Sequence, residues 1–455
     1  MSPDLWTSTE IAAATGGTAH GDFSVDAVTF DSREVIGGEL FVAMKGAETD
    51  GHRFVASAVS RGAAGCLVSQ PIETPHVLVG DGFAALQALG RVARARTDAT
   101  IIGVTGSVGK TSVKEALKMA LTEAAPAVTH ASVKSYNNHT GVPLSLARMP
   151  ADTRFGIFEM GMNHAGELAA LTRLVRPNIA IVTAIASAHR EFFDSEEAIA
   201  DAKAEIFEGL EPGGTAILPF DSPHFARLKQ HAERYAARIL TFGLNEGADV
   251  RPLRSAEIDT GTVLQISIND QQIGFTLRQP GLHWQRNSLA VLATAYAAGA
   301  DLTAAALGLA QMRGLQGRGA QHVINWQGGE VRLLDESYNA NDASMRAALE
   351  VLRDAPTPGR RIAVLGAIGE LGTESEKIHG ALAEPIADSG ASPVLLLGEE
   401  MRPLADEIGA EHLESAAGAE DWLRDTLKAG DTVLIKGSNY HGLSRLVAAF
   451  TGADA

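Results

Sequence analysis

The sequence is poor in cysteine, and Cys66 is the single thiol in 455 residues. One thiol can form neither a disulfide framework nor a cluster of thiolate metal ligands, so we expect a protein of the reducing cytoplasm. Long apolar runs are lacking as well, and no stretch approaches the roughly 20 residues that cross a bilayer. Residues 1–14 carry acidic side chains where a signal peptide would be basic. The sequence therefore predicts neither membrane insertion nor a signal peptide.

Basic residues are in the minority, with 38 Lys and Arg against 55 Asp and Glu and a formal net charge of −17 at pH 7. Such a chain has no basic face to displace the counterions of a nucleic acid, so we exclude a nucleic-acid partner. Apolar residues make up 45% of the chain, which is enough for sizeable cores. A length of 455 residues is too great for one core and predicts two or three domains.

The most informative stretch is residues 101–112. Residues 101–104 form an apolar run typical of a buried strand, a glycine-rich turn follows, and residues 113–121 have helical spacing. This context predicts a phosphate-binding loop, because glycines let backbone N–H groups surround a phosphate at the start of a helix. Lys110 would contact the outer phosphates, and the Thr111 hydroxyl would bind magnesium. The predicted nucleotide contacts of the loop are Gly106, Ser107, Val108, Gly109, Lys110, Thr111 and Ser112.

The loop departs from the strict pattern at one position. Val104 stands where that pattern has its first glycine, and Gly103 lies one residue early. A simple glycine turn between a strand and a helix is therefore the alternative to a phosphate site. The flanking strand and helix favour the phosphate site.

Apolar runs and helical spacing divide the chain into three α/β units, residues 1–97, 98–316 and 317–455. The predicted strands are residues 40–44, 66–68, 77–79, 101–104, 155–158, 179–182, 331–334, 362–365, 394–397 and 432–435. Those of the third unit alternate with helical stretches, as in a Rossmann-like arrangement. That unit has no GxGxxG motif, so the sequence gives no support for a dinucleotide site.

Two strands of the second unit lead to residues with ligand-binding side chains. Glu159 follows the strand at residues 155–158, and His189 comes soon after the strand at residues 179–182. Ligands of open α/β sheets lie beyond the carboxyl ends of the strands, so both side chains are placed to meet the nucleotide. A structural role is the commoner one for either residue alone, but the pair downstream of a phosphate loop favours function.

Lys203 lies on the apolar face of a predicted helix. Residues 194–197 give an N-cap signal for this helix. The apolar residues of the face are Ile199, Ile206, Phe207 and Leu210. Burial of an ammonium group is costly, so one hypothesis is that Lys203 extends to solvent. The other is a neutral amine that reacts with carbon dioxide to give a carbamate, an oxygen ligand suited to magnesium.

Further motifs follow in order along nearly the whole chain. They are Asp31-Ser32-Arg33, residues 38–45, Asp50-Gly51-His52, residues 103–111, residues 137–143, Glu159-Met160-Gly161, Asn163-His164, Gly166-Glu167, Ala188-His189, residues 202–206, Gly317-Arg318, residues 335–341, Glu370-Leu371-Gly372 and Lys436-Gly437-Ser438. Together they resemble the Mur ligase family, whose own form of the phosphate loop explains the displaced glycine. The Ser-Tyr-Asn-Ala-Asn run at residues 337–341 and the Glu-Leu-Gly turn are similar to the member that adds D-alanyl-D-alanine.

Three positions depart from the family pattern. Trp284 stands where an asparagine is usual, and Arg190 replaces a leucine. Ala367-Ile368 replaces an Asp-Met pair before the Glu-Leu-Gly turn.

The resemblance implies a fold of three α/β domains. These are a small N-terminal uridine-binding domain (residues 1–97), a central P-loop mononucleotide-binding domain (98–316) and a C-terminal Rossmann-like domain (317–455). It also implies amide ligation through an acyl phosphate in peptidoglycan precursor synthesis, with ATP as co-substrate, two Mg²⁺ ions and a carbamylated lysine. The implied partners are a UDP-muramoyl-tripeptide and D-Ala-D-Ala, and the implied state is a cytoplasmic monomer.

The resemblance further implies roles for individual residues. The catalytic residues would be Lys110, Glu159, His189 and Lys203, and the metal ligands Thr111, Glu159, His189 and Lys203. Beyond the loop, ATP would be bound by Asn287, Arg318 and Asp335. The UDP-linked substrate would be bound by Ser32, Arg33, Lys45, Asn137, Asn138 and Thr140. The dipeptide would be bound by Ser337, Asn339 and Asn341.

Two alternatives remain. One is another amide ligase of the superfamily, either a diaminopimelate-adding enzyme or a folylpolyglutamate synthetase. The former should carry an Asp-Asn-Pro-Arg-type motif that this sequence lacks, and the latter usually lacks the uridine-binding domain. The other alternative is a P-loop regulatory or binding protein, which would not need Glu159, His189 and Lys203 together.

Overall fold

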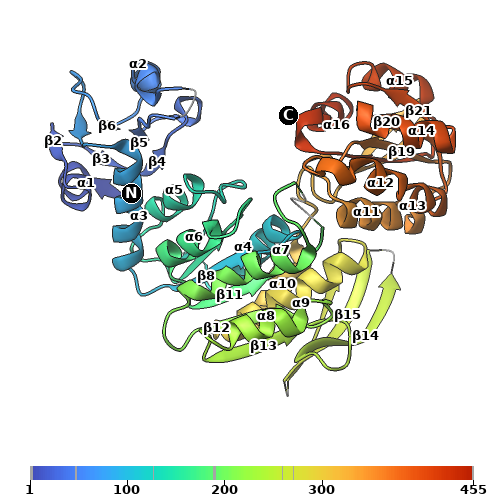
Figure 1. Cartoon of the computed structure of the whole chain (residues 1–455), viewed down its shortest axis with the longest axis horizontal. Coiled ribbons are helices and arrows are strands. Elements are labelled where there is room, and N and C mark those ends of the chain that lie inside the picture. Colours follow the sequence, from blue (N-terminus) through green and yellow to red (C-terminus); the bar gives the residue numbers. More distant parts are fainter. Residues whose placement is uncertain are drawn as a thin grey trace.

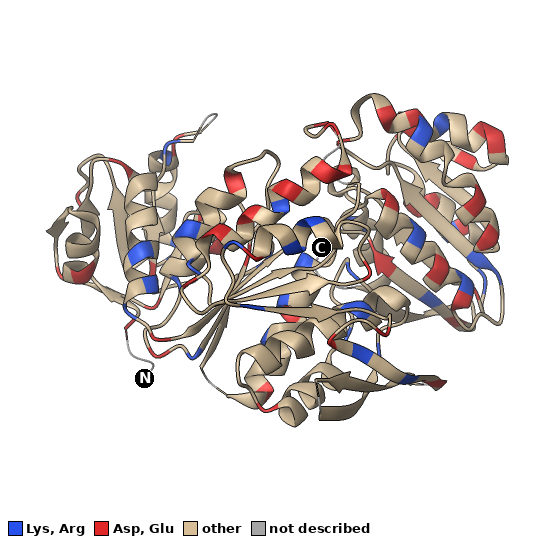
Figure 2. Cartoon of the chain, turned by 60° about the horizontal axis from the view of Figure 1, so that its bottom comes forward, with Lys and Arg blue, Asp and Glu red and all other residues tan. Residues whose placement is uncertain are grey.

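The computed structural model describes residues 4–46, 49–126, 128–187, 191–258, 260–269 and 271–452. Three open sheets, of five, nine and six strands, follow one another along the chain, and helices pack against them (Figure 1). The N-terminal and C-terminal lobes lie on either side of the central lobe. Acidic and basic residues are mixed along the helices of all three lobes, whereas the central strands are largely uncharged (Figure 2). Within the described ranges, no helix is both long and apolar enough to cross a bilayer.

The N-terminal sheet has the strand order β2-β7-β6-β5-β4, in which β2 is antiparallel to β7 and the other pairs are parallel. The elements of this lobe are β1 (Trp6–Thr7), α1 (Ser8–Thr15), β2 (Thr18–His20), β3 (Ser24–Val25), β4 (Ala27–Thr29), η1 (Ser32–Glu34), β5 (Glu39–Val42), η2 (Gly51–Phe54), α2 (Val55–Ser60), β6 (Gly65–Val68), β7 (His76–Leu78) and α3 (Gly82–Ala95). All residues of β5 and β6 are buried, as expected for parallel strands covered on both faces.

The central sheet has the order β16-β15-β14-β13-β12-β11-β8-β10-β9. Its lobe contains β8 (Thr100–Thr105), α4 (Lys110–Ala124), β9 (Thr129–Ala131), α5 (Gly141–Ala147), β10 (Phe155–Glu159), α6 (Glu167–Val175), β11 (Ile179–Val182), α7 (Glu196–Ala204), η3 (Glu205–Gly209), β12 (Thr215–Pro219), α8 (Phe225–Ala232), β13 (Arg238–Phe242), β14 (Val250–Ile258), β15 (Gly261–Ile268), β16 (Gln271–Leu277), α9 (Leu282–Ala297) and α10 (Leu302–Gln311). Strands β14, β15 and β16 form an antiparallel extension of a parallel sheet. Strand β8 lies between β10 and β11, so the strand order reverses there, and open α/β sheets bind ligands beside such a point.

Helix α5 is shared between two cores. Every residue of this helix is buried. Leu144 and Ala147 pack in the core of the N-terminal lobe, among residues of α3 and the five-stranded sheet. Val142 and Leu146 pack in the core of the central lobe. The N-terminal lobe is therefore attached to the central lobe by apolar packing.

The C-terminal sheet has the order β17-β18-β22-β19-β20-β21, with β17 antiparallel to β18 and the other pairs parallel. Its lobe contains β17 (Ala320–Trp326), β18 (Gly329–Glu336), α11 (Asp342–Asp354), β19 (Arg361–Gly366), η4 (Gly372–Glu374), α12 (Ser375–Gly380), α13 (Ala383–Asp388), β20 (Ala391–Leu397), η5 (Glu399–Met401), α14 (Arg402–Ile408), β21 (Glu411–Leu413), α15 (Ala419–Thr426), β22 (Thr432–Lys436), η6 (Asn439–His441) and α16 (Leu443–Thr451). The parallel strands and flanking helices match the predicted Rossmann-like arrangement.

All the predicted strands are present with small shifts of their ends, but the predicted helix with Lys203 differs. Its α-helical part ends at Ala204, and residues 205–209 form a 3-10 turn. The Thr172 hydroxyl donates a hydrogen bond to the Ile206 carbonyl (2.7 Å), and the Leu210 amide bonds three residues back to Phe207. These bonds favour the tighter 3-10 winding over a further α-helical turn. The sequence did not predict the short strands β1, β2, β3, β4, β9 and β21, nor the longer strand β17.

Candidate active site

The phosphate loop connects β8 to α4, and both of its glycines have a positive φ angle. Gly106 has a φ of 152° and Gly109 a φ of 83°. A Cβ on Gly106 would lie 1.9 Å from the Thr183 hydroxyl oxygen, and one on Gly109 would lie 3.0 Å from Asn287 Oδ1. Both positions therefore need glycine. The Ser107 amide donates to the Ala184 carbonyl (2.8 Å), which fixes the loop against the chain after β11.

Lys110 is the first residue of α4 and bends back over the loop. Its Nζ donates a hydrogen bond to the Gly106 carbonyl (2.7 Å). Burial lowers the pKa of Lys110, the nearby Glu159 carboxylate opposes that effect, and the charge of Arg318 adds to it. An ammonium group in this position is available to phosphate oxygens.

Glu159, at the end of β10, and Thr111 form a pair of oxygen donors beside the loop. The Thr111 hydroxyl donates to Glu159 Oε2 (2.9 Å). The Asn137 side-chain amide donates to Glu159 Oε1 (2.7 Å). The Glu159 side chain is buried, so these two bonds fix its orientation. A hydroxyl and a carboxylate are the ligand types that magnesium takes beside a nucleotide, and the donor set fits Mg²⁺.

Lys203 is fully buried in α7 and does not extend to solvent. Its Nζ has no hydrogen-bond partner among the described residues. Burial lowers its pKa well below the usual value, the charge of Lys110 acts in the same direction, and Glu205 opposes both. The solvent-directed hypothesis is therefore wrong. A buried amine with a lowered pKa is uncharged more readily, which is the form that reacts with carbon dioxide.

His189 and Arg190 lie outside the described residues, so the structure does not place the predicted histidine ligand. Among the described residues, no group of three or more His, Cys, Asp or Glu side chains could hold a metal ion. The predicted metal ligands that are described thus comprise Thr111, Glu159 and Lys203, and Lys203 would supply an oxygen only as a carbamate.

The predicted nucleotide residues of the third unit lie at the start of the C-terminal lobe. Asp335, 1% exposed, accepts hydrogen bonds from the Gly317 amide (2.6 Å) and the Ser337 hydroxyl (2.6 Å). It therefore fixes the turn that carries Arg318. The Arg318 guanidinium lies 4.1 Å over the Tyr338 ring, an arrangement typical of a cation–π contact. The charge of Arg318 also contributes to the lowered pKa of Lys110.

The three residues predicted to bind a dipeptide are in different environments. Ser337 is buried, and its hydroxyl donates a hydrogen bond to the Asp335 carboxylate. The Asn341 side chain caps α11 by accepting a hydrogen bond from the Ser344 amide (2.9 Å). Asn339 is exposed, and its backbone carbonyl accepts a hydrogen bond from Lys436 Nζ. Asn339 is therefore the exposed residue of the three.

The residues predicted to bind the UDP-linked substrate are divided between two lobes. In the central lobe, Asn138 Oδ1 accepts hydrogen bonds from the Thr140 hydroxyl (3.0 Å) and the Gly141 amide (2.8 Å), so both residues shape the turn before α5. In the N-terminal lobe, Ser32 is buried and Lys45 is exposed.

Arg33 is strongly exposed. Its guanidinium is paired with Asp31 at 2.7 Å, and the arginine side chain is 88% exposed. The next residue, Glu34, accepts hydrogen bonds from Lys134 and Tyr136 of the central lobe.

Sequence reasoning missed two residues that support the site. Lys114 is fully buried and donates hydrogen bonds to the carbonyls of Ser132 (2.9 Å) and Lys134 (2.7 Å). Its position four residues after Lys110, on the same face of one helix, was the available signal. The role of Thr183, whose hydroxyl donates to the Val108 carbonyl, had no signal in the sequence.

Two of the three departures from the family pattern are described. Trp284 is buried, and its Nε1 would lie 3.3 Å from a Cβ on Gly319, so it packs where the central and C-terminal lobes meet. Ala367 and Ile368 are also buried, and the Ile368 amide donates to His379 Nε2 (2.9 Å).

A glycine loop between a central strand and a helix, at the point where the strand order reverses, defines the class of P-loop α/β proteins. Comparison with known families matches three stretches: the Mur ligase family catalytic domain at residues 24–107, the Mur ligase middle domain at residues 104–295 and the Mur ligase glutamate ligase domain at residues 322–439. The chain belongs to the Mur ligase family.

Two curated relatives carry one name, UDP-N-acetylmuramoyl-tripeptide–D-alanyl-D-alanine ligase. That of Rickettsia prowazekii (strain Madrid E) is 32% identical over 97% of this chain and 99% of its own. That of Escherichia coli (strain K12) is 34% identical over 94% of each chain. The crystal structure of MurF from Acinetobacter baumannii matches with a TM-score of 0.83 and 29% identity, over 98% of this chain and 99% of that one.

Proposed function

We propose that this chain is an ATP-dependent ligase that joins D-alanyl-D-alanine to a UDP-N-acetylmuramoyl-tripeptide in peptidoglycan precursor synthesis. The observation that carries the proposal is the phosphate loop with Lys110 folded over it and the bonded pair Thr111 and Glu159 beside it. The buried Lys203, whose pKa the charge of Lys110 helps to lower, adds to it. The alignment of the whole chain with relatives that bear this activity in their name supports it.

The reaction has two steps. The γ-phosphoryl group passes from ATP to an oxygen of the terminal tripeptide carboxylate, which gives ADP and an acyl phosphate. The dipeptide amine then attacks the acyl carbon, the bond to the phosphate oxygen breaks, and phosphate and a proton are released. Both reactants of the first step are anions, so catalysis consists mainly of charge neutralisation and positioning.

The residues have separate tasks in this mechanism. Lys110 binds the outer phosphates. Thr111 and Glu159 would hold one magnesium ion, whose charge offsets that of the phosphates. Asn137 keeps the Glu159 carboxylate oriented. A second ion would be held by His189 and carbamylated Lys203, close to the acceptor carboxylate.

The nucleotide would be held from two lobes. Asn287 lies against Gly109 of the loop, and Arg318 approaches from the C-terminal lobe. Asp335 acts by fixing the turn that carries Arg318. Closure of the C-terminal lobe would complete the site and exclude water from the acyl phosphate.

The substrates would also be bound by residues from different lobes. We place the uridine group at Ser32, Arg33 and Lys45, and the dipeptide at Asn339. The sugar-peptide part would lie beside the segment that contains Asn137, Asn138 and Thr140, and the turn at residues 337–341 would frame the dipeptide pocket.

The proposal includes three domains, at residues 1–97, 98–316 and 317–455. The five-, nine- and six-stranded sheets support this division, because each sheet lies within one of these ranges. We further propose that the protein works as a monomer in the cytoplasm, since each of the proposed contacts comes from one chain.

The test is a measurement of ADP release with UDP-muramoyl-tripeptide, in the presence and absence of D-Ala-D-Ala, with mass spectrometry of the product. Release should depend on the dipeptide and fall sharply when free D-alanine replaces it. The product should be the UDP-linked pentapeptide. ADP release that is independent of an amine acceptor would contradict ligation.

A further inference from the structure

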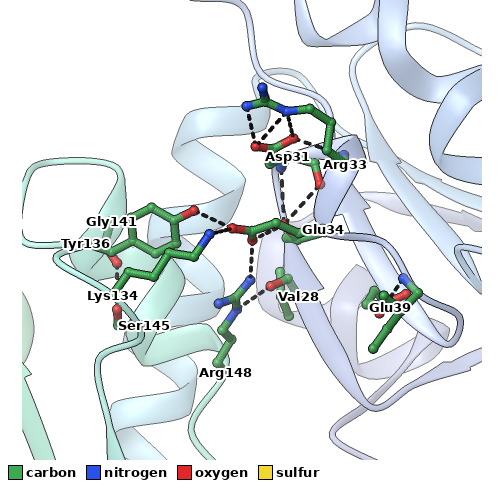
Figure 3. A network of polar contacts seen from close by, with 12 residues as sticks. Val28, Asp31, Arg33, Glu34, Glu39, Lys134, Tyr136, Gly141, Ser145 and Arg148 are labelled. Atoms are coloured by element: carbon green, nitrogen blue, oxygen red, sulfur yellow. Dashed lines mark hydrogen bonds and ion pairs between the residues drawn. The ribbon is translucent and has the colours of Figure 1, made fainter. Parts of the chain in front are cut away.

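Glu34 connects the N-terminal lobe to the central lobe (Figure 3). It is the last residue of η1, and its Oε1 accepts hydrogen bonds from Lys134 Nζ (2.6 Å) and from the Tyr136 hydroxyl (2.8 Å). Its Oε2 lies 3.4 Å from Arg148 Nη2. The Glu34 side chain is only 22% exposed, so the contacts are partly shielded from water. One carboxylate thus holds three side chains of the other lobe through charge-assisted bonds.

The segment that Glu34 contacts, residues 132–137, also holds the proposed magnesium ligands. Lys134 and Tyr136 flank Ser135, whose hydroxyl oxygen lies 3.3 Å from that of Thr111. Asn137 follows directly and donates to Glu159. A displacement of this segment would therefore move the groups that orient Thr111 and Glu159.

Residues 132–137 are held from two sides. Beneath them, the buried ammonium group of Lys114 donates to the carbonyls of Ser132 and Lys134. Lys134 has a φ of 53°, a left-handed conformation that is unfavourable for a residue with a side chain. Such a conformation persists where surrounding contacts determine it. Lys114 supplies those contacts within the central lobe, and Glu34 supplies them across the lobe boundary.

The other end of this connection is the proposed uridine site. Asp31 caps η1 by accepting a hydrogen bond from the Arg33 amide (2.9 Å), and it also pairs with the Arg33 guanidinium. Glu34 is the next residue. A ligand that binds Ser32 and Arg33 therefore acts on the short helix from which Glu34 projects.

We propose that Glu34 is a positioning residue that couples the uridine-substrate site to the magnesium-nucleotide site by fixing residues 132–137. The inference rests on the proposed function for the ligand at each end. Substrate bound at η1 fixes the position of Glu34, which in turn fixes Lys134 and Tyr136 through hydrogen bonds. The segment that contains these two residues then orients the side chains of Thr111 and Glu159. Coupling of this kind is reciprocal, so the nucleotide strengthens binding of the UDP-linked substrate by the same factor.

The test measures this factor by calorimetry on the full chain. The affinity for a non-hydrolysable ATP analogue with Mg²⁺ is determined with and without saturating UDP-muramoyl-tripeptide. We expect the substrate to tighten nucleotide binding about fivefold or more in the unaltered protein. In Glu34→Gln and in Lys134→Met, the ratio should fall to about one to two, with the separate affinities changed less. The double variant should resemble either single variant, because both changes break the same contact.

Glu10→Gln is the matched control. Glu10 is also an acid of the N-terminal lobe that accepts hydrogen bonds, but its partner is Thr7 in the same lobe. This variant should keep the full ratio, and thermal unfolding of all variants separates a loss of coupling from a loss of folding.

Three results would overturn the inference and leave the proposed function intact. A ratio near one in the unaltered protein would show that the two sites are independent. An unaltered ratio in both Glu34→Gln and Lys134→Met would show that coupling takes another route. If the nucleotide affinities with and without substrate weaken equally, so that their ratio is unchanged, Glu34 has only a structural role. If the unaltered protein does not bind UDP-muramoyl-tripeptide, the proposed function fails first, and the inference fails with it.

Discussion

The buried amine of Lys203 has no hydrogen-bond partner among the described residues, and the charge of Lys110 adds to the effect of burial in lowering its pKa. Two cationic side chains in one buried site repel each other unless an anion lies between them or one of them loses its charge. Phosphate oxygens of ATP would meet the first condition at Lys110. A carbamate on Lys203 would meet the second and replace a cation with an anion.

Lys110→Ala should lower ATP turnover by at least about 100-fold, because the variant loses the charge that stabilises the transferred phosphoryl group. Binding of a uridine nucleotide, measured by calorimetry, should be unchanged because that site lies in another lobe. Lys118→Ala is the matched control, an exposed lysine on the same helix. Turnover close to that of the unaltered protein in Lys110→Ala would contradict the phosphate-loop assignment.

Lys203→Ala should be nearly inactive, and short carboxylates such as acetate should restore part of the activity by occupying the vacated space. Lys203→Glu should not substitute, because its carboxylate is too close to the backbone to reach the same position. Lys229→Ala, at an exposed lysine of α8, is the control. Full activity of Lys203→Ala in buffer depleted of carbon dioxide would rule out the carbamate.

Lys203→Met should increase stability even though it removes activity. The change replaces a buried, unpartnered amine by an apolar side chain of similar length, and such replacements stabilise by about 1–4 kcal/mol. The measurement is the free energy of unfolding in denaturant at pH 7, without carbon dioxide.

The stability difference should depend on pH. The pKa of Lys203 is lowered in the folded state from the ordinary 10.5, so the unfolded chain binds more protons between these two values. The stability of the unaltered protein therefore rises with pH in that window, and the advantage of methionine shrinks as pH approaches 10.5. A variant that is less stable at every pH would contradict this account of the buried amine.

Asn339→Ala and Ser337→Ala should affect different ligands. Asn339 is exposed, so its loss should raise the KM for D-Ala-D-Ala roughly tenfold with little change in the KM for ATP. Ser337 bonds to Asp335, which fixes the turn of Arg318, so its loss should chiefly raise the KM for ATP. Steady-state kinetics with each substrate varied in turn would decide, and the reverse pattern would move the dipeptide pocket elsewhere.

The local parts of the site could be predicted from the sequence. A strand, a glycine turn and a helix are adjacent in the chain, so the loop around Lys110 needed no tertiary information. The apolar face around Lys203 was also a local pattern, although the 3-10 turn that ends its helix depends on Thr172, a residue of another helix.

Contacts between distant residues could not be predicted. Asn137 and Glu159 are 22 positions apart, and Glu34 and Lys134 are 100 apart, so neither pair has a sequence pattern. Asn341 illustrates a different difficulty, because an asparagine suits a peptide ligand and a helix cap equally well. Its bond to the Ser344 amide, which only the structure contains, identifies the cap.

Helix α5 has a consequence for how the chain unfolds. Leu144 and Ala147 complete the N-terminal core although they lie beyond the predicted boundary at residue 97. A fragment that ends at residue 97 would leave the apolar face of α3 exposed to water and should aggregate. The N-terminal and central lobes should accordingly melt in one cooperative transition.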